Sequence, residues 1–279
     1  MPKNTYTSGL VDYHTHTTLC KHASGEPHEY VEHAIAAGLS EFGIADHCPI
    51  PAGYDTRHRM DIAQMPEYRA AYESLAEKYS DKIKLRYGIE ADYVPGKMDE
   101  LAKFLRENKF DYVLGSIHFI GDFAFDDPEC LAEWKRKGRP DMVWTRYSEL
   151  MADLVETGLF DILSHFDLPK KFGFYPADMK SFLGRIGDVL DLAARRGMAI
   201  EINSSGLRKT VREIYPSPAI LKIAREKGLP ITLGSDAHSP DEVAANYREA
   251  VELALSAGYR EITCYSARKI SRTVPLPRR

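Results

Sequence analysis

Short β-forming runs alternate with longer amphipathic stretches along the whole chain, and this alternation constrains the fold more than any other feature. In the longer stretches apolar residues recur at intervals of three and four, as they do in amphipathic helices. The β-forming runs are 10–14, 42–46, 84–90, 112–117, 161–164, 199–203, 231–235 and, more weakly, 261–265. The helical stretches are 28–38, 64–79, 97–108, 141–158, 178–197, 217–228 and 239–258.

A repeated order of strand then helix requires parallel strands joined by crossovers. Seven or eight such units in 279 residues fit a closed (β/α) barrel better than an open doubly wound sheet. No GxGxxG turn follows the first run, and no linker rich in Ser, Gly or Pro interrupts the chain. We therefore expect one α/β domain over 1–279. Irregular segments at 48–60 and 120–140 follow the second and fourth runs, where a barrel carries its binding loops.

Charge and hydropathy exclude several classes of protein. The chain has 37 Lys and Arg against 41 Asp and Glu, a net charge of −4, which argues against a nucleic-acid partner. No apolar stretch is long enough to span a bilayer and no secretory signal is evident, so we expect a cytoplasmic protein without a membrane partner. The four cysteines form no CxxC pair and are expected to be reduced, although Cys20 and Cys48 lie beside candidate ligands.

Histidines and carboxylates follow most of the predicted strands. His14 and His16 stand two residues apart at the end of the first run, so both imidazoles project to one face and can bind one ion. The carboxyl ends of all strands in a parallel barrel meet in one bowl. The residues expected around this bowl are His14, His16, His22, His47, Glu90, His118, His165, Asp236 and His238.

Each of these residues alone has an ordinary structural explanation. A single histidine after an apolar strand, such as His118 or His165, is more often incidental, and Glu90 can serve in an ion pair. Their joint placement favours a metal site, because so many buried imidazoles and carboxylates are costly without a cation. We expect His28, His33 and His58 to be surface residues without a role in the site.

Nine ligand groups exceed what one ion uses, since a tetrahedral site needs four. The sequence therefore predicts two or three divalent metal ions close together. Clusters of this kind suit hydrolysis of phosphate esters, because they provide hydroxide at neutral pH and neutralise phosphoryl oxygens. Zn²⁺, Mn²⁺ and Fe²⁺ all accept such ligands, so the identity of the metal stays open.

The ordered motifs resemble those of the polymerase and histidinol phosphatase (PHP) superfamily over about residues 9 to 270. The segment from Glu201 through Asn203 to Arg208, followed by Tyr215 and Pro216, resembles its histidinol-phosphate phosphatase branch. This resemblance implies a distorted seven-stranded, TIM-like (β/α) barrel with three metal ions. It implies a first ion on His14, His16, Glu90 and Asp236, a second on Glu90, His118 and His165, and a third on His22, His47 and His238.

The implied reaction is hydrolysis of L-histidinol phosphate to L-histidinol and phosphate in histidine biosynthesis, by attack of a metal-bridging hydroxide. Asp236 and His238 are candidate acids for the leaving alkoxide, with a metal-bound water as a rival. Asp92 and Glu201 are candidates for binding the substrate's amine or imidazole, and Arg208, Lys170 and Lys171 for the phosphate. Ser116 and Asn203 are expected to orient substrate or ligands.

Two other functions stay open at this point. A nucleotide phosphatase, phosphodiesterase or exonuclease of the same superfamily would use the same metal bowl with another pocket. A non-catalytic metal-binding relative is disfavoured, because every expected ligand position holds a competent residue. The partner we expect is a small phosphate monoester; the sequence leaves the oligomeric state open.

Overall fold

Seven parallel strands form one sheet in the computed structural model, which describes residues 6–277. Each strand pairs with the next one of this sheet along the chain, as crossover connections require. The strands are β1 (Val11–Asp12), β2 (Glu41–Ile44), β3 (Lys84–Asp92), β4 (Tyr112–Ser116), β7 (Ile162–Leu163), β8 (Ala199–Asn203) and β9 (Ile231–Gly234). All seven lie within or next to the predicted runs.

Hydrogen bonds between the first and last of these strands bring the sheet nearly to closure. The Tyr13 amide donates to the Leu233 carbonyl at 3.1 Å, and the Asp236 amide donates to the His14 carbonyl at 2.7 Å. Thr15 and Ala237 form an isolated parallel bridge beyond them. The predicted seven-stranded, TIM-like (β/α) barrel is thereby confirmed.

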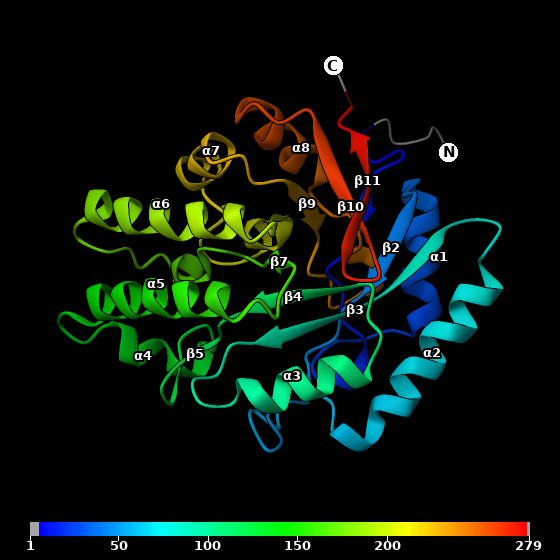
Figure 1. Ribbon diagram of the computed structural model, residues 1–279, viewed down its shortest axis with the longest axis horizontal. Helices are drawn as coiled ribbons and strands as arrows, with labels where there is room; N and C mark the ends of the chain where they lie inside the picture. The colour runs from blue at the N-terminus through cyan, green and yellow to red at the C-terminus, as the bar shows by residue number, and fades with distance from the viewer. Residues whose placement is uncertain (1–5, 278–279) are drawn as a thin grey trace.

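Helices surround this barrel, with α5 and α6 side by side and α7 and α8 next along the rim (Figure 1). Glycine in the left-handed conformation ends two of them, at Gly38 and Gly158. The surrounding helices are α1 (Pro27–Ala37), α2 (Met65–Lys78), α3 (Met98–Glu107), α5 (Arg139–Thr157), α6 (Met179–Arg195), α7 (Pro218–Glu226) and α8 (Tyr247–Ser256). No helix of the described residues is both long and apolar enough to cross a membrane.

The last predicted helix is wrong at its start. Residues Pro240–Glu242 form a short 3₁₀ turn, and the α-helix begins only at Tyr247. Ala244 and Asn246 adopt positive φ angles of 55° and 60°, which interrupts the helical path. The Ala244 amide donates to the Asp12 carboxylate at 3.1 Å, so this segment is held against β1.

The predicted eighth strand does not join the barrel. It forms β10 (Glu261–Ser266), which pairs antiparallel with β11 (Lys269–Pro275) in a separate hairpin. Arg272 pairs with Glu41 at the start of β2, and the Thr263 hydroxyl donates to the Ile231 carbonyl at the start of β9. Arg268 also contacts Asp161, just before β7. The hairpin therefore covers the amino end of the barrel.

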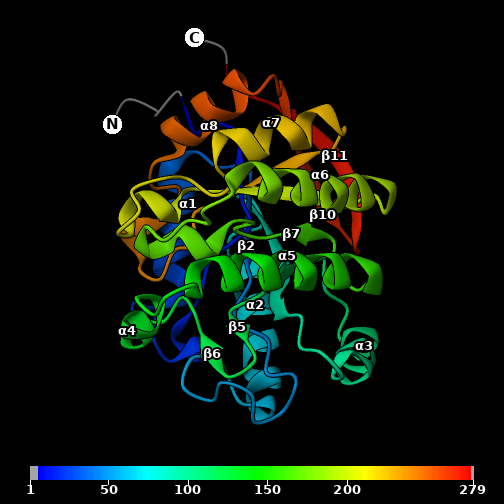
Figure 2. The same ribbon diagram turned by 90° about the vertical axis from the view of Figure 1, so that its left-hand side faces the viewer.

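The opposite end carries the longer loops. The segment after β4 contains β5 (Phe119–Ile120), β6 (Phe123–Ala124) and the short helix α4 (Leu131–Trp134). Figure 2 shows β6 and α4 on one side of the molecule and the β10–β11 hairpin on the other. Ligands bound at the carboxyl ends of the strands therefore meet these loops rather than the hairpin.

A tyrosine fills the inside of the barrel. The Tyr112 ring stacks on Tyr13 with centroids 4.8 Å apart, and its hydroxyl donates to the Tyr13 carbonyl at 2.7 Å. Gly88 on β3 leaves room for this ring, because a Cβ built there would lie 2.3 Å from Tyr112 Cζ. The ring is buried, so it has little space into which to move.

We expect Gly88→Ala to lower the free energy of unfolding by about 1–3 kcal/mol, because overpacking displaces the buried ring. Gly184→Ala is the matched control, since a Cβ there meets no atom within 4 Å and Ala favours the α6 helix. Urea denaturation of both variants measures the difference. Equal loss of stability in the two would show that the barrel interior accommodates the extra methyl group.

Candidate metal centre

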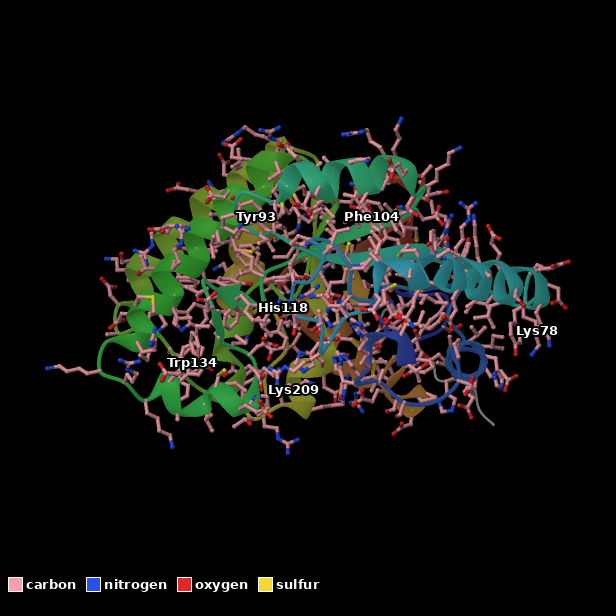
Figure 3. The ribbon with its side chains drawn as sticks, turned by 90° about the horizontal axis from the view of Figure 1, so that it is seen from below. Lys78, Tyr93, Phe104, His118, Trp134 and Lys209 are labelled. Atoms are coloured by element: carbon pink, nitrogen blue, oxygen red, sulfur yellow. The ribbon has the colours of Figure 1, made fainter. Side chains whose placement is uncertain are left out.

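The carboxyl ends of the strands and the loops that follow them enclose a cavity of about 320 Å³. His118 and Lys209 both line it, and Figure 3 shows them toward the middle of the molecule. His14 and His16 lie deeper and are almost fully buried. The expected ligands on the cavity wall are His22, His47, Glu90, His118, His165, Asp236 and His238.

The carboxylate of Glu90 is the centre of this cluster. His47 Nδ1 lies 2.8 Å from Glu90 Oε2, and His165 Nε2 lies 2.9 Å from Oε1. Three more Nε2 atoms approach the same carboxylate, from His14 at 3.4 Å, His16 at 3.6 Å and His118 at 3.6 Å. One carboxylate thus meets five imidazoles from four different strand ends.

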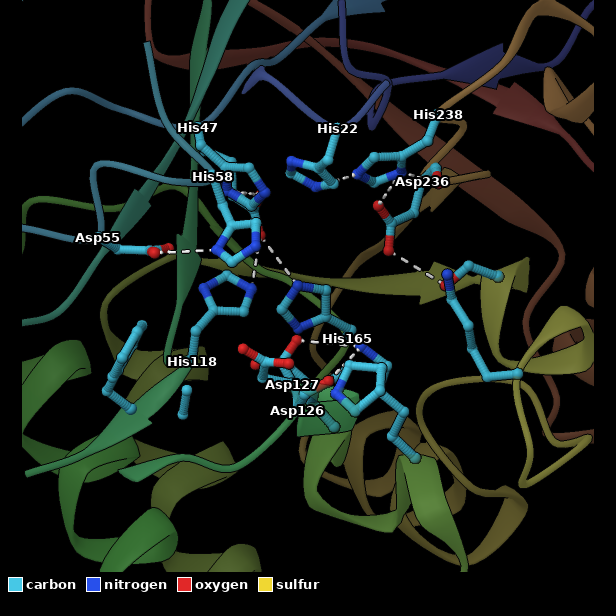
Figure 4. Close-up of a pocket in the computed structure, with 18 of the residues that line it drawn as sticks. His22, His47, Asp55, His58, His118, Asp126, Asp127, His165, Asp236 and His238 are labelled. Carbon is cyan, nitrogen blue, oxygen red and sulfur yellow. Dashed lines mark hydrogen bonds and ion pairs between the residues drawn. The ribbon is translucent and has the colours of Figure 1, made fainter. Parts of the chain in front are cut away.

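Ligand atoms also gather in threes. In each of several groups the three candidate donor atoms lie within 4.8 Å of one another. Three such groups are His22 with His47 and His238, His14 with His16 and Asp236, and His14 with Glu90 and His165. Figure 4 shows His22 and His238 next to each other at one end of the pocket, away from His118 and His165. The first group unites the three histidines expected to share one ion.

Oxygen atoms orient four of the histidines through Nδ1. A hydrogen bond at Nδ1 leaves the Nε2 lone pair available to a cation. Two histidines meet carboxylates: His14 Nδ1 lies 2.8 Å from Glu201 Oε1, and His118 Nδ1 lies 2.8 Å from Asp92 Oδ1. Two others meet backbone carbonyls: His22 Nδ1 lies 2.7 Å from the carbonyl of Cys20, and His238 Nδ1 lies 3.0 Å from that of Asp236.

Several of the buried donor atoms lack a hydrogen-bond partner, and this fits a metal centre. They include Nε2 of His14 and Nε2 of His16. Burial and the neighbouring His47 lower the pKa of His16 to about 3, and burial lowers the pKa of His47 to about 3 as well. Both imidazoles are therefore neutral at pH 7. Neutral imidazoles beside a carboxylate are the donor set that zinc-like divalent cations prefer.

Asp236 is held in an unusual backbone conformation. Its φ of 52° lies in the left-handed region, which non-glycine residues seldom adopt. Ser205 donates to its Oδ2 at 3.1 Å, and its Oδ1 lies 3.3 Å from His16 Nε2. Backbone strain of this kind persists where surrounding contacts enforce it, as they do at functional sites.

Two carboxylates expected to contact substrate lie behind the ligands instead. Asp92 and Glu201 are fully buried and are not part of the cavity wall. Asp92 bonds His118, while Glu201 bonds His14 and also accepts the His165 amide at 2.9 Å. The alternation of side chains along a strand correctly predicts that Asp92 and Glu201 lie on the inner face, but it does not predict how deeply they are buried.

Ser116 and Asn203, the two residues expected to orient substrate or ligands, also lie off the cavity wall. Ser116 Oγ donates to Glu90 Oε1 at 2.6 Å. Asn203 Nδ2 donates to Glu201 Oε2 at 3.1 Å. Both contacts support residues of the ligand cluster, which agrees with the orienting role and not with substrate contact.

Two of the three cations expected to bind phosphate do not face the cavity. Lys170 is buried and pairs with Asp167 at 3.0 Å, and Arg208 pairs with Glu242 at 3.0 Å. The third expected cation, Lys171, does line the cavity, together with Lys209, the sequence neighbour of Arg208. Lys170 and Arg208 lie in 3₁₀ turns, where consecutive side chains point in directions about 120° apart, so a shift of one residue changes which side chain faces the cavity.

The segment 48–60 contributes residues to the cavity that sequence reasoning missed. His58, expected at the surface, lines the wall with Asp55 and Arg59. Its Nδ1 lies 2.9 Å from Asp55 Oδ1, and its ring lies 5.2 Å from that of His22. The available signal was the position of this loop after the second strand. His28 and His33 are exposed, as expected.

Comparison with known proteins agrees with this geometry. The PHP domain model matches residues 12–205, and a model described as PHP-associated matches residues 219–252. The chain belongs to the PHP family. The second match covers β9 (Ile231–Gly234), the last strand of the barrel, and the candidate ligands Asp236 and His238.

Several similar proteins are named as histidinol-phosphatases. The chain is 40% identical to the probable histidinol-phosphatase of Deinococcus radiodurans, over 92% of the chain and 96% of that protein. It is 27% identical to the histidinol-phosphatase of Bacillus subtilis, over 86% and 98% of the two chains. Its fold resembles that of a histidinol phosphate phosphatase from Lactococcus lactis, which was solved with zinc, L-histidinol and phosphate. The TM-score is 0.81 and the sequence identity 24%, over 95% of this chain and 100% of that one.

We expect Glu201→Gln to weaken metal binding about 10- to 100-fold, because the amide no longer holds His14 with a full negative charge. Glu213→Gln is the control, since that carboxylate is half-exposed and outside the cluster. Zinc titration of metal-stripped protein, with circular dichroism to verify folding, gives both affinities. Identical zinc affinity in the two variants would remove Glu201 from the metal centre.

Proposed function

We propose that this chain is a metal-dependent phosphomonoesterase that hydrolyses L-histidinol phosphate to L-histidinol and phosphate, in cytoplasmic histidine biosynthesis. The observation that carries the proposal is the Glu90 carboxylate, which lies within 3.6 Å of imidazole nitrogens from five histidines. One carboxylate among so many imidazoles suits a cluster of ions rather than a single one. The identity of 40% with a probable histidinol-phosphatase supports the choice of substrate.

We assign the ligands to three ions. Bound divalent ions supply a nucleophile at neutral pH and neutralise charge on the phosphoryl oxygens. Zn²⁺, Mn²⁺ and Fe²⁺ all suit these donors. The sets are His14, His16, Glu90 and Asp236 for one ion, Glu90, His118 and His165 for another, and His22, His47 and His238 for a third.

Asp236 and His238 fit better as ligands than as acids for the leaving group. Burial tends to raise the pKa of Asp236, but His14 and His16 outweigh it and hold that pKa well below its usual range. Burial and the adjacent His16 hold the pKa of His238 well below its usual range. At pH 7 the carboxylate is ionised and the imidazole neutral, so neither holds a proton suited to donation.

The cavity wall carries both positive and negative side chains, which suits a substrate that bears both kinds of charge. Lys171, as expected from the sequence, and Lys209 provide positive charge for the phosphate. The carboxylates of Asp55, Asp126 and Asp127 line the same cavity and suit the ammonium and imidazole of histidinol. Burial opposes ionisation of Asp126, but Lys171 and His118 outweigh it and lower its pKa.

The alternative is a nucleotide phosphatase or phosphodiesterase of the same family. The carboxylates on the wall would repel a second phosphate group, and the chain as a whole carries a net charge of −4. These charges favour a substrate with a single phosphate and a cationic remainder.

We expect phosphate release from L-histidinol phosphate to exceed release from adenosine monophosphate, para-nitrophenyl phosphate and single-stranded DNA. Glu90→Ala should reduce turnover at least about 100-fold, since even partners outside the first ligand sphere contribute 10- to 100-fold. His28→Ala, an exposed histidine, should leave turnover unchanged. Metal content and circular dichroism are measured on each sample.

A clear preference for nucleotides would replace the proposed substrate while keeping the chemistry. Full turnover by Glu90→Ala at full metal content would contradict the central place of this carboxylate.

A further inference from the structure

Arg59 has nitrogen donors that no group of the protein uses. Its side chain is only 2% exposed, and it lines the cavity. Nη2 donates to Asp92 Oδ2 at 2.8 Å. Nε and Nη1 are both buried and have no hydrogen-bond partner among the described residues. A buried guanidinium with unpaired donors is costly, so this arrangement suits an acceptor that arrives with a ligand.

The surrounding contacts fix the guanidinium but leave it short of acceptors. The centroid of the Tyr54 ring lies 4.9 Å from Arg59 Cζ. The Tyr54 hydroxyl donates a hydrogen bond to Asp92 Oδ2 at 3.1 Å. The other oxygen of Asp92 binds His118 Nδ1. Asp55 Oδ2 lies 3.6 Å from Nε, beyond hydrogen-bond distance, and Asp55 Oδ1 binds His58. Both nearby carboxylates are therefore shared with other groups.

Asp92 holds the Arg59 guanidinium beside the candidate metal ligands. It bonds Arg59 through one oxygen and His118 through the other, and His118 in turn approaches Glu90. Figure 4 shows His118, His58 and Asp55 on the same side of the pocket. An anion held at this side by metal ions thus lies on the same wall as the guanidinium.

We propose that Arg59 binds the phosphoryl oxygens of the substrate and of the product phosphate. This inference rests on the proposed phosphomonoesterase function and adds to it a specific phosphate-binding residue. A planar guanidinium matches phosphate oxygens in two hydrogen bonds, which an ammonium group cannot do. The binding also gives an acceptor to Nη1, one of the two unpaired donors.

The chain offers a matched control two residues away. Arg57 lies in the same loop, but its side chain is 62% exposed and pairs with Asp127 and Glu129 at 3.1 and 3.0 Å. Arg57→Met therefore removes the same charge from the same segment without removing a donor from the cavity. Arg59→Lys keeps the charge beside Asp92 and guards against misfolding of Arg59→Met.

The test uses inorganic phosphate as the probe on zinc-loaded protein, by calorimetric titration and as a competitive inhibitor. We expect Arg59→Met to weaken phosphate binding about 10- to 100-fold, the range for hydrogen bonds to charged groups, and to raise the KM for L-histidinol phosphate in parallel. Arg59→Lys should lose about 3- to 10-fold, because it keeps the charge and loses the fork. Arg57→Met should stay within about twofold of the wild type, the usual effect of an exposed ion pair.

The outcomes separate the two proposals. Unchanged phosphate affinity of Arg59→Met or, if that variant does not fold, of Arg59→Lys, at wild-type zinc content, overturns the inference. Loss of zinc with unchanged phosphate affinity of the zinc-loaded fraction also overturns it, since Arg59 would then act only by holding Asp92. Phosphate binding that depends on Arg59, in a wild type that does not hydrolyse L-histidinol phosphate, refutes the proposed substrate and supports the inference.

Discussion

A single buried carboxylate, that of Glu90, sets the geometry of the whole site. Burial alone would favour its protonated form, but His47, His14 and His118 outweigh burial and hold its pKa well below the usual range. The charge therefore persists inside the barrel and requires partners on every side. Parallel strands meet this requirement because the residues at their carboxyl ends all lie around the same centre. The contacts that close the barrel therefore also bring the candidate ligands together.

A second layer of carboxylates makes the cluster rigid. Glu201 and Asp92 are fully buried, and each accepts a hydrogen bond from the Nδ1 of one histidine, which fixes the ring and directs Nε2 inward. Arg59 belongs to this layer through Asp92. The Asp92 carboxylate therefore orients both a candidate metal ligand, His118, and a candidate phosphate-binding group, Arg59.

The sequence predicted the fold and the gathering of the ligands because both follow from periodicity. Strand ends are visible as apolar runs, and residues such as His14 and His118 follow them directly. The sequence did not show how deeply each side chain is buried or which side chains face the cavity. Asp92 shares a strand face with Glu90 but lies behind His118, and in the 3₁₀ turns the cavity faces Lys171 and Lys209 rather than Lys170 and Arg208. The burial of Arg59 depends on a loop path that no periodic pattern encodes.

The bond between β1 and β9 has a consequence for how the protein is made. Ser235 donates to the Asp12 carboxylate across 223 residues of sequence, and the neighbouring His14 and Asp236 join at the same junction. Contacts so distant in sequence form slowly and late. During synthesis the first histidines leave the ribosome long before their final partner exists. A growing chain therefore cannot complete the candidate metal centre before Asp236 and His238 have been made.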